Sequence, residues 1–379
     1  MKKILIFIIL ISICLTNNSK ASSNTNNTTE ESEEIMTEQQ SQYGIDSFIN
    51  QSEKYTDEFD LYDIFKEGLT GRFDNNKILK ILLKTFNNNL KESLLTISGI
   101  IIIVIINSIL QSISENLGNE SVSKIAFFIQ YILIVTLIMK NFSDIITNTK
   151  NAILDLSSFS LILIPLLSTL IVATGNITTS SLIEPILLSL VSFISNFITS
   201  ILIPIILVAT ALGIMSKVSS QIQIEKLSKF LKKSSVWVLT TVLGIFMGLA
   251  SLESGLTSNV DNITKKAGKS IISTAVPVVG GIIGDAIDTI VGYTNIIKNA
   301  AGIVGIFVVL SICIKPIMEL ATLTIVYSLS SALCEPIADK KVVELIDQMS
   351  STFKVMLAVM VTITLMVIIG LALVIRITS

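Results

Sequence analysis

The chain contains no histidine, only three cysteines and one tryptophan, and just 15% of its 379 residues are charged. Without histidine, the commonest general base and the commonest metal ligand are both missing, which excludes the histidine-dependent proteases of membranes. The shortage of charge is equally informative, because soluble domains usually carry about 25% charged residues. Much of this protein's surface therefore faces something other than water.

Other functional classes are excluded by what the sequence omits. Its cysteines, Cys14, Cys313 and Cys334, lie in or beside apolar segments and do not form a disulfide framework. The basic residues stand singly between apolar runs, so no face suits nucleic acid. Phosphate-binding and intramembrane aspartyl-protease motifs are both incomplete, since Ile263 and Ile282 replace required glycines. We therefore predict that the protein is not an enzyme and has no catalytic, metal-binding or cofactor-binding residues and no cofactor.

What the sequence does contain is apolar residues, which make up 51% of the chain and give a mean hydropathy of +0.75. They come in runs of about 20 residues, the length of a helix that crosses about 30 Å of hydrocarbon. We predict an all-α, polytopic helical membrane protein of six to eight spans, drawn from 94–113, 122–139, 156–174, 182–215, 236–256, 300–333 and 353–375. A glycine-rich segment at 271–291 is either a further span or a re-entrant segment.

Residues 1–21 have the pattern of a secretory signal peptide, with Lys2 and Lys3 before an apolar core and Ala21 at a small-residue cleavage site. An uncleaved anchor and a lipoprotein signal at Cys14 are the alternatives. Cleavage would place the new N-terminus outside the cytoplasm.

Residues 22–92 form a predicted acidic, extracytoplasmic head with 14 acidic and 7 basic residues counted from residue 21. Its first part, 22–42, is poor in large apolar residues and is predicted to be disordered. Its last part, 74–86, predicts a basic amphipathic helix that lies along the membrane surface or binds a partner. Residues 93–379 then form the membrane domain.

The topology of that domain stays open. The run 182–215 is too long for one simple crossing, so it either tilts and breaks near Pro204 or forms a hairpin around Asn196. Lysines at 217–233 mark a cytoplasmic loop by the positive-inside rule, but those at 265–269 follow only one span later. Simple alternation cannot place both loops inside.

Two kinds of position in the apolar runs are candidates for function. Lys315 and Glu319 lie four residues apart and share a helical face, where they either line a conduit or neutralise each other at a kinked helix end. Small residues spaced by four let helices approach closely in lipid. Two such pairs, Gly244 with Gly248 and Gly280 with Gly284, predict packing within the chain or between copies.

Several short patterns together resemble the stage III sporulation protein AE family of spore-forming Firmicutes. They lie between about residue 78 and the C-terminus: Val122–Ala126, Glu184-Pro185, Ser235–Leu239, Pro277–Gly280 with Asp285, and Lys298-Asn299-Ala300. By this resemblance, Pro277, Gly280, Asp285, Lys298 and Asn299 mark the segment to test first.

The resemblance implies a non-enzymatic subunit of a channel-like, secretion-related complex between mother cell and forespore, needed for forespore development after engulfment. It also implies a multi-pass protein located in the mother-cell membrane around the forespore. Its implied partners are membrane lipids, the other subunits of that complex and, as an option, further copies of itself; nucleic acid is not among them. A stand-alone secondary transporter and a membrane scaffold that recruits partners through its head are the alternatives.

Overall fold

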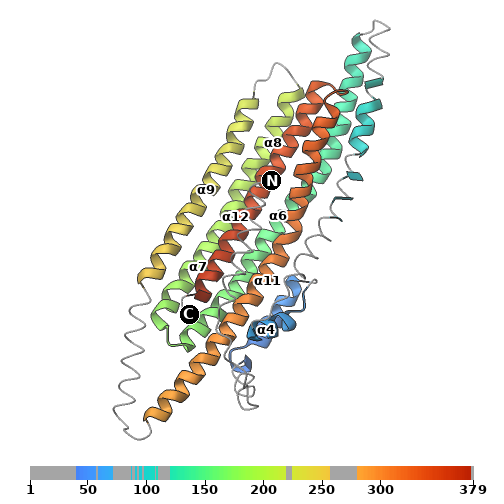
Figure 1. The fold of residues 1–379 in the computed structure, drawn as a ribbon. Coiled ribbons are helices and arrows are strands. Elements are labelled where there is room, and N and C mark those ends of the chain that lie inside the picture. Colours follow the sequence, from blue (N-terminus) through green and yellow to red (C-terminus); the bar gives the residue numbers. More distant parts are fainter. Residues whose placement is uncertain are drawn as a thin grey trace.

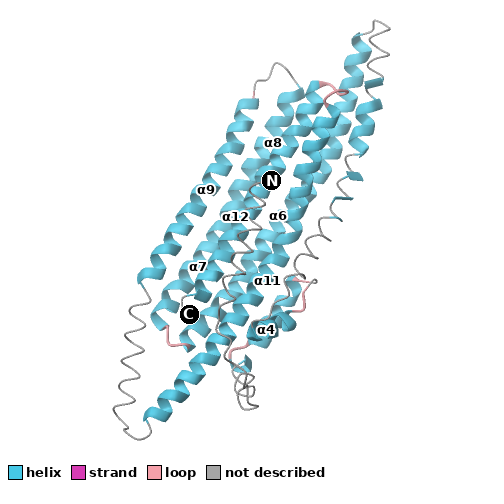
Figure 2. Ribbon diagram, in the orientation of Figure 1, coloured by secondary structure: helices cyan, strands magenta, loops and turns pink. Residues whose placement is uncertain are grey.

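The computed structural model describes residues 40–56, 59–70, 120–218, 224–256 and 280–376, with scattered residues between 87 and 109. Within these residues every regular element is a helix (Figure 2). Five helices are long and apolar enough to cross a membrane: Phe128–Ala173, Ile177–Lys217, Glu225–Gly248, Asp288–Cys334 and Lys340–Ile375. The predicted all-α membrane fold is confirmed, and the first predicted span, 94–113, is described only in part.

The long helices run side by side in an elongated bundle (Figure 1). Helix α12 packs against α11, α8 and α9, and α6 packs against α11 and α7. Buried aromatic rings pack between α6, α11 and α12: the ring centroid of Phe353 lies 5.1 Å from that of Tyr327 and 6.1 Å from that of Phe142. The bundle helices are α6 (Glu120–Ala173), α7 (Ile177–Phe197), α8 (Ile203–Val218), α9 (Glu225–Leu256), α11 (Gly280–Cys334) and α12 (Lys340–Arg376).

Helix α6 corrects the prediction that 122–139 and 156–174 are separate spans. It is one helix of 54 residues, about 81 Å long at 1.5 Å per residue. Residues 140–155 are polar enough to interrupt the hydropathy, but they contain no glycine or proline that would end a helix. Helix α11 likewise joins 280–291 to the predicted span 300–333 in 55 residues.

The long apolar run at 182–215 lies in one continuous helical rod, so the alternative of a hairpin around Asn196 is wrong. Between α7 and α8 the chain forms a π-helical turn, η3 (Ile198–Leu202), and then continues helically. Pro204 follows directly and cannot donate a backbone hydrogen bond to the preceding turn. A π turn is a common local adjustment of the helical register, and here it lets the rod continue past the proline.

Two of the turns between the long helices are described. Gly175, between α6 and α7, has a φ of 82°, which a residue with a side chain rarely adopts. Asp339 accepts a hydrogen bond from the backbone N–H of Lys341 at 2.8 Å and so caps the start of α12.

The described part of the head packs against α11 and, to a smaller extent, against α6 (Figure 1). It consists of α3 (Ile45–Ser52), the 3-10 turn η2 (Glu53–Tyr55) and α4 (Leu61–Thr70). Phe48 and Tyr55 contact Phe159 of α6, and Phe59 meets Phe307 of α11 edge to face at 5.3 Å. The predicted signal peptide and the predicted helix at 74–86 lie outside the described residues.

Candidate functional site

A polar pocket of about 580 Å³ lies where the head meets α6 and α11. Three elements supply its lining, and most of the side chains are charged, amide or hydroxyl groups. These are Lys54 and Tyr55 of η2; Asn148, Asn151, Ala152, Asp155 and Ser158 of α6; and Ser311, Ile312, Lys315, Pro316 and Glu319 of α11. Such a lining is unusual on helices that are otherwise rich in isoleucine and leucine.

The wall contributed by α6 follows from residue spacing. Positions 148, 151, 155 and 158 are separated by three or four residues, so they lie along one face of the helix. All four side chains are exposed, whereas Phe159 and Leu156 on the other faces are fully buried. The polar residues that interrupt the hydropathy of α6 therefore form one side of the pocket.

The wall contributed by α11 contains the predicted Lys315 and Glu319. Both line the pocket, and the helix continues past Pro316 to Cys334, so the pair does not stand at a helix end. The amide of Asn148 donates to Glu319 Oε2 at 3.5 Å, a long hydrogen bond that joins the two walls.

The head closes the third side. Lys54 Nζ lies 4.7 Å from the centre of the Tyr55 ring, within the range of a cation–π contact. Next to them, the hydroxyls of Thr56 and Ser311 are 2.9 Å apart, which ties the head to α11.

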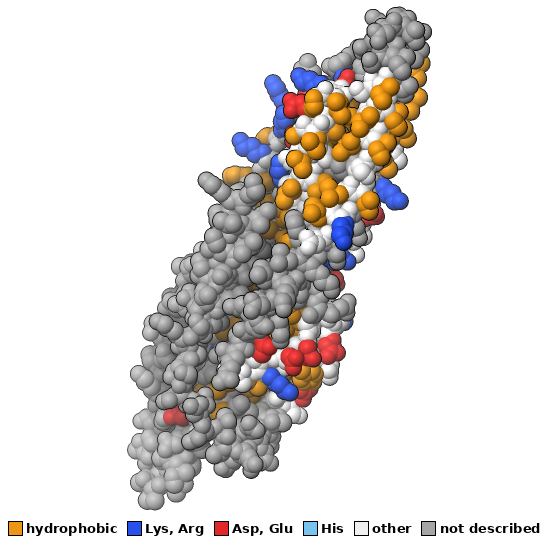
Figure 3. Space-filling view, turned by 45° about the vertical axis from the view of Figure 1, so that its right-hand side comes forward, with side chains coloured by type: hydrophobic (Ala, Val, Ile, Leu, Met, Phe, Trp, Pro, Cys, Tyr) orange, Lys and Arg blue, Asp and Glu red, His pale blue; other side chains and the backbone are white. Residues whose placement is uncertain are grey.

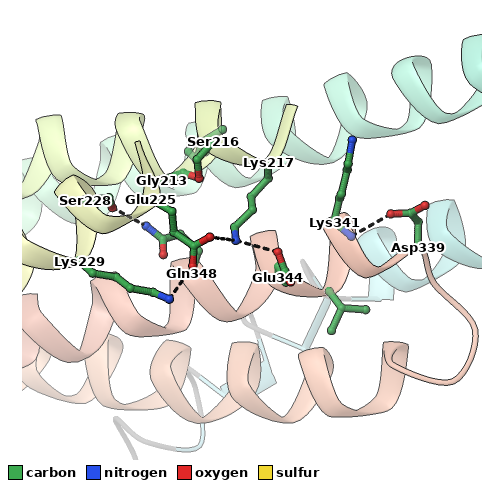
Figure 4. A network of polar contacts seen from close by, with 12 residues as sticks. Gly213, Ser216, Lys217, Glu225, Ser228, Lys229, Asp339, Lys341, Glu344 and Gln348 are labelled. Atoms are coloured by element: carbon green, nitrogen blue, oxygen red, sulfur yellow. Dashed lines mark hydrogen bonds and ion pairs between the residues drawn. The ribbon is translucent and has the colours of Figure 1, made fainter. Parts of the chain in front are cut away.

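A second polar cluster, the lysine clasp, lies at the opposite end of the bundle and joins α8, α9 and α12. Lys217 Nζ donates to Glu225 Oε2 at 2.8 Å and to Glu344 Oε2 at 2.7 Å, and Lys229 also pairs with Glu225 (Figure 4). Only 8% of the Lys217 side chain is exposed. Since each helix contributes one end to this contact, the clasp fixes how the three helices meet.

Beside the clasp, Gln348 donates to Ser228 Oγ at 3.1 Å in the groove left by Gly213 (Figure 4). A Cβ at Gly213 would lie 1.8 Å from Gln348 Nε2, so glycine is required for this close approach. The sequence pattern indicated the lysine-rich loop but neither Gly213 nor Gln348. Their contact joins α8 to α12, which lies far away in the sequence.

Lys298, which the resemblance singled out, joins α11 to the end of α12. It is fully buried, and its Nζ donates to the backbone carbonyl of Ile375 at 3.1 Å, in the last turn of α12. A cation there satisfies a carbonyl that has no helical partner and complements the helix dipole. The amide oxygen of the neighbouring Asn299 is buried without a hydrogen-bond partner among the described residues.

The close helix packing predicted for the two glycine pairs can be examined only for Gly244 and Gly248. Gly244 and Gly248 of α9 have no neighbouring atom within 4 Å of the position a Cβ would take. Pro277 lies outside the described residues, and at Gly280, Gly284 and Asp285 only the helical backbone is described. The close approaches lie instead at Gly302 against Ile375 and Gly305 against Leu163. Packing between copies through Gly244 and Gly248 stays a prediction.

In chemical terms, the pocket can hold water and bind polar groups through charges of both signs. The described residues contain no cluster of three or more side chains suited to a metal ion. Cys313 and Cys334 are free and buried.

Comparison with known proteins agrees with the resemblance seen in the sequence. Residues 59–378 match the family described as stage III sporulation protein AE, which takes in α4 and every helix of the bundle. The stage III sporulation protein AE of Bacillus subtilis (strain 168) is 28% identical over 276 residues, covering 73% of this chain and 69% of that protein. No solved structure matches the chain. The chain belongs to the stage III sporulation protein AE family, and it is a helical, multi-pass membrane protein of sporulation.

Proposed function

We propose that this protein is a non-enzymatic subunit of a multi-protein channel or secretion-like complex that connects the mother cell to the forespore. Membership of a sporulation family supports the setting. The feature that carries the proposal is the length of the apolar helices, which is greater than a lipid bilayer can cover.

The candidate span Ile177–Lys217 has 41 residues, about 62 Å of helix, and Asp288–Cys334 has 47, about 70 Å. Hydrocarbon is about 30 Å thick, and even a tilt of about 40° lengthens the path through it to only about 39 Å. Large apolar side chains are nevertheless exposed along the whole first rod, from Ile177 to Met215. Roughly a third or more of that surface lies beyond the lipid and needs another protein surface to cover it.

The exposed apolar surface is also concentrated on particular faces. Figure 3 shows hydrophobic side chains over one end of the bundle and charged side chains further along the same side. At that end the exposed residues of α6 include Ile125, Phe128 and Ile132, with 52–61% of each residue exposed. Patches of this kind mark contact with lipid or with other subunits.

The two polar clusters suggest an orientation. By the positive-inside rule, the lysine clasp end faces the cytoplasm of the mother cell. The head lies towards the other end of the bundle (Figure 1). In the proposed orientation it therefore faces the space between the two membranes that surround the forespore. With α6 as one crossing and α7–α8 as another, a chain that starts outside and crosses at 94–113 brings Lys217 to the cytoplasmic side.

The test is to isolate the tagged full-length chain from sporulating cells in a mild detergent. The proposal expects other sporulation membrane proteins to purify with it in fixed proportions, and expects deletion of the gene to stop forespore development after engulfment. A single, unaccompanied chain that drives solute uptake when placed alone in lipid vesicles would instead establish the stand-alone transporter. Deletion of residues 22–73 tests the remaining alternative, a membrane scaffold that recruits partners through its head. Full function without these residues would contradict that alternative.

A further inference from the structure

We propose that the polar pocket between the head, α6 and α11 is a binding site for a small solute that carries one positive and one negative group, of the amino-acid type. The proposal rests on the proposed function in one respect, because it takes this side of the bundle to face water in the assembled complex. Its basis is the contrast between the two sides of the bundle, the charges in the pocket and the pocket's size.

The first step is that the pocket lies level with an apolar outer surface. A small apolar cavity is lined by Ser160 of α6, Phe246 of α9 and Ile363 of α12, so these positions share one level along the bundle. There α9 exposes Ile245, with 59% of its surface accessible, while α6 exposes Ser158 in the pocket and Leu154 and Leu161 beside it. Since α9 and the α6–α11 pair lie on opposite sides of the bundle (Figure 1), the α9 side suits lipid, whereas the pocket face of the other side needs water or polar groups.

The second step concerns charge. The pocket contains two cations, Lys54 and Lys315, and two carboxylates, Asp155 and Glu319. Among the residues that the structure describes, neither Asp155 nor Lys315 forms an ion pair; the ion pairs found are those of the lysine clasp. A charge in such a setting is stabilised by water or by a group of opposite sign. A solute with both signs can serve Asp155 and Lys315 at once, whereas a simple anion or cation can serve only one of them.

The third step concerns position and size. Glu319 lies at the end joined by Asn148, and Lys54 lies at the end joined by Thr56 and Ser311, so charges are distributed along the pocket. A volume of about 580 Å³ falls in the range of about 300–1,000 Å³ that small-molecule sites occupy. The amide of Asn151 and the amide oxygen of Asn148, whose nitrogen donates to Glu319, remain for uncharged polar groups. L-Glutamine, whose side chain ends in an amide, is therefore a suitable probe.

The experiment measures binding of labelled L-glutamine to the full-length protein in detergent, beside two analogues of similar shape. N-Acetylglutamine lacks the positive group, and glutamine amide lacks the carboxylate. Because each analogue leaves one charged side chain without its partner, we expect each to bind about tenfold or more weakly than L-glutamine.

Variants assign the contacts. Asp155→Asn is expected to weaken L-glutamine about tenfold and leave N-acetylglutamine unchanged, because that analogue has no ammonium to lose. Lys315→Gln is expected to weaken L-glutamine and leave glutamine amide unchanged. Asp144→Asn on α6 and Lys354→Gln on α12 are matched controls, since both residues are exposed outside the pocket and should bind as the wild type does.

Equal binding of all three compounds, or no saturable binding, would overturn the site. So would controls that lose as much affinity as the pocket variants. These results are separate from those that test the proposed function. A chain that binds nothing but purifies with its partners disproves the pocket alone, and a chain that binds L-glutamine but purifies without partners disproves the complex alone.

Discussion

The replacement Lys217→Met tests the idea that the lysine clasp holds three helix ends together. Methionine has a similar length and keeps the packing, but it removes both hydrogen bonds from Nζ. A buried hydrogen bond to a charged group contributes about 1.5–3 kcal/mol, and an exposed ion pair about 0–1 kcal/mol. Because Glu225 and Glu344 are 40% and 38% exposed, these two contacts fall between the limits. We expect a loss of about 2 kcal/mol in the free energy of unfolding.

The loss has a second origin that a double variant can reveal. Without Lys217, the carboxylates of Glu225 and Glu344 face each other with only Lys229 left to compensate. Adding Glu344→Gln removes one of these charges, so the double variant should recover about 1 kcal/mol of the loss. Lys233→Met is the control, since this lysine is exposed on α9 and its removal should change stability by less than about 0.5 kcal/mol.

Unfolding can be followed through Trp237, the single tryptophan of the chain, which lies on α9, the helix that supplies Glu225 and Lys229 to the clasp. The protein would be titrated from a mild detergent into a denaturing one, and the midpoints compared for the wild type, Lys217→Met, Glu344→Gln, the double variant and Lys233→Met. A Lys217→Met protein as stable as the wild type, or a double variant that loses the sum of the two single changes, would refute the clasp.

Three further outcomes can be checked together. Gly213→Leu should prevent stable packing of α8 on α12, because any side chain there meets Gln348; size-exclusion chromatography in detergent would detect the aggregated product. Phe59→Ala should loosen the head by about 2 kcal/mol through loss of its aromatic contact, seen as faster proteolysis of the head with the bundle intact. Single cysteines at Lys54 and Lys226 should differ when the protein is produced in non-sporulating cells stripped of their wall, where the head side of the membrane faces the medium: an impermeant thiol reagent should label the first directly and the second only after lysis.

Hydropathy alone predicted the fold class, because runs of about 20 apolar residues have few uses outside a membrane. It failed on where helices begin and end. The stretch from Lys140 to Asp155 was polar enough to be interpreted as a loop between spans, yet it keeps a helical backbone because nothing in it breaks a helix. Hydropathy measures the solvent that a segment prefers, and helix continuity depends on glycine, proline and caps.

The site was only partly predictable for a related reason. Lys315 and Glu319 stand out because a charge in an apolar run is costly, and both line the pocket. Asp155 did not stand out, because it directly precedes the predicted span 156–174, and solvation is easy near the end of a span. Because α6 is continuous, Asp155 lies well inside a long helix, and it lines the same pocket as Lys315. Lys54 could not be associated with either, since it lies 261 positions before Lys315 in the chain.

The two sides of the bundle place complementary demands on an assembly. Helix α9 is the least covered of the five, with only 22% of its most apolar window buried, and Gly244 and Gly248 leave an open, flat strip on it. Small residues four apart allow another helix to approach closely, so this side can take a neighbouring subunit or lipid at little cost. The α6–α11 side carries charges that neither lipid nor a flat apolar helix can satisfy. A complex that packs subunits against α9 and keeps water at the pocket meets both demands, and the reverse arrangement meets neither.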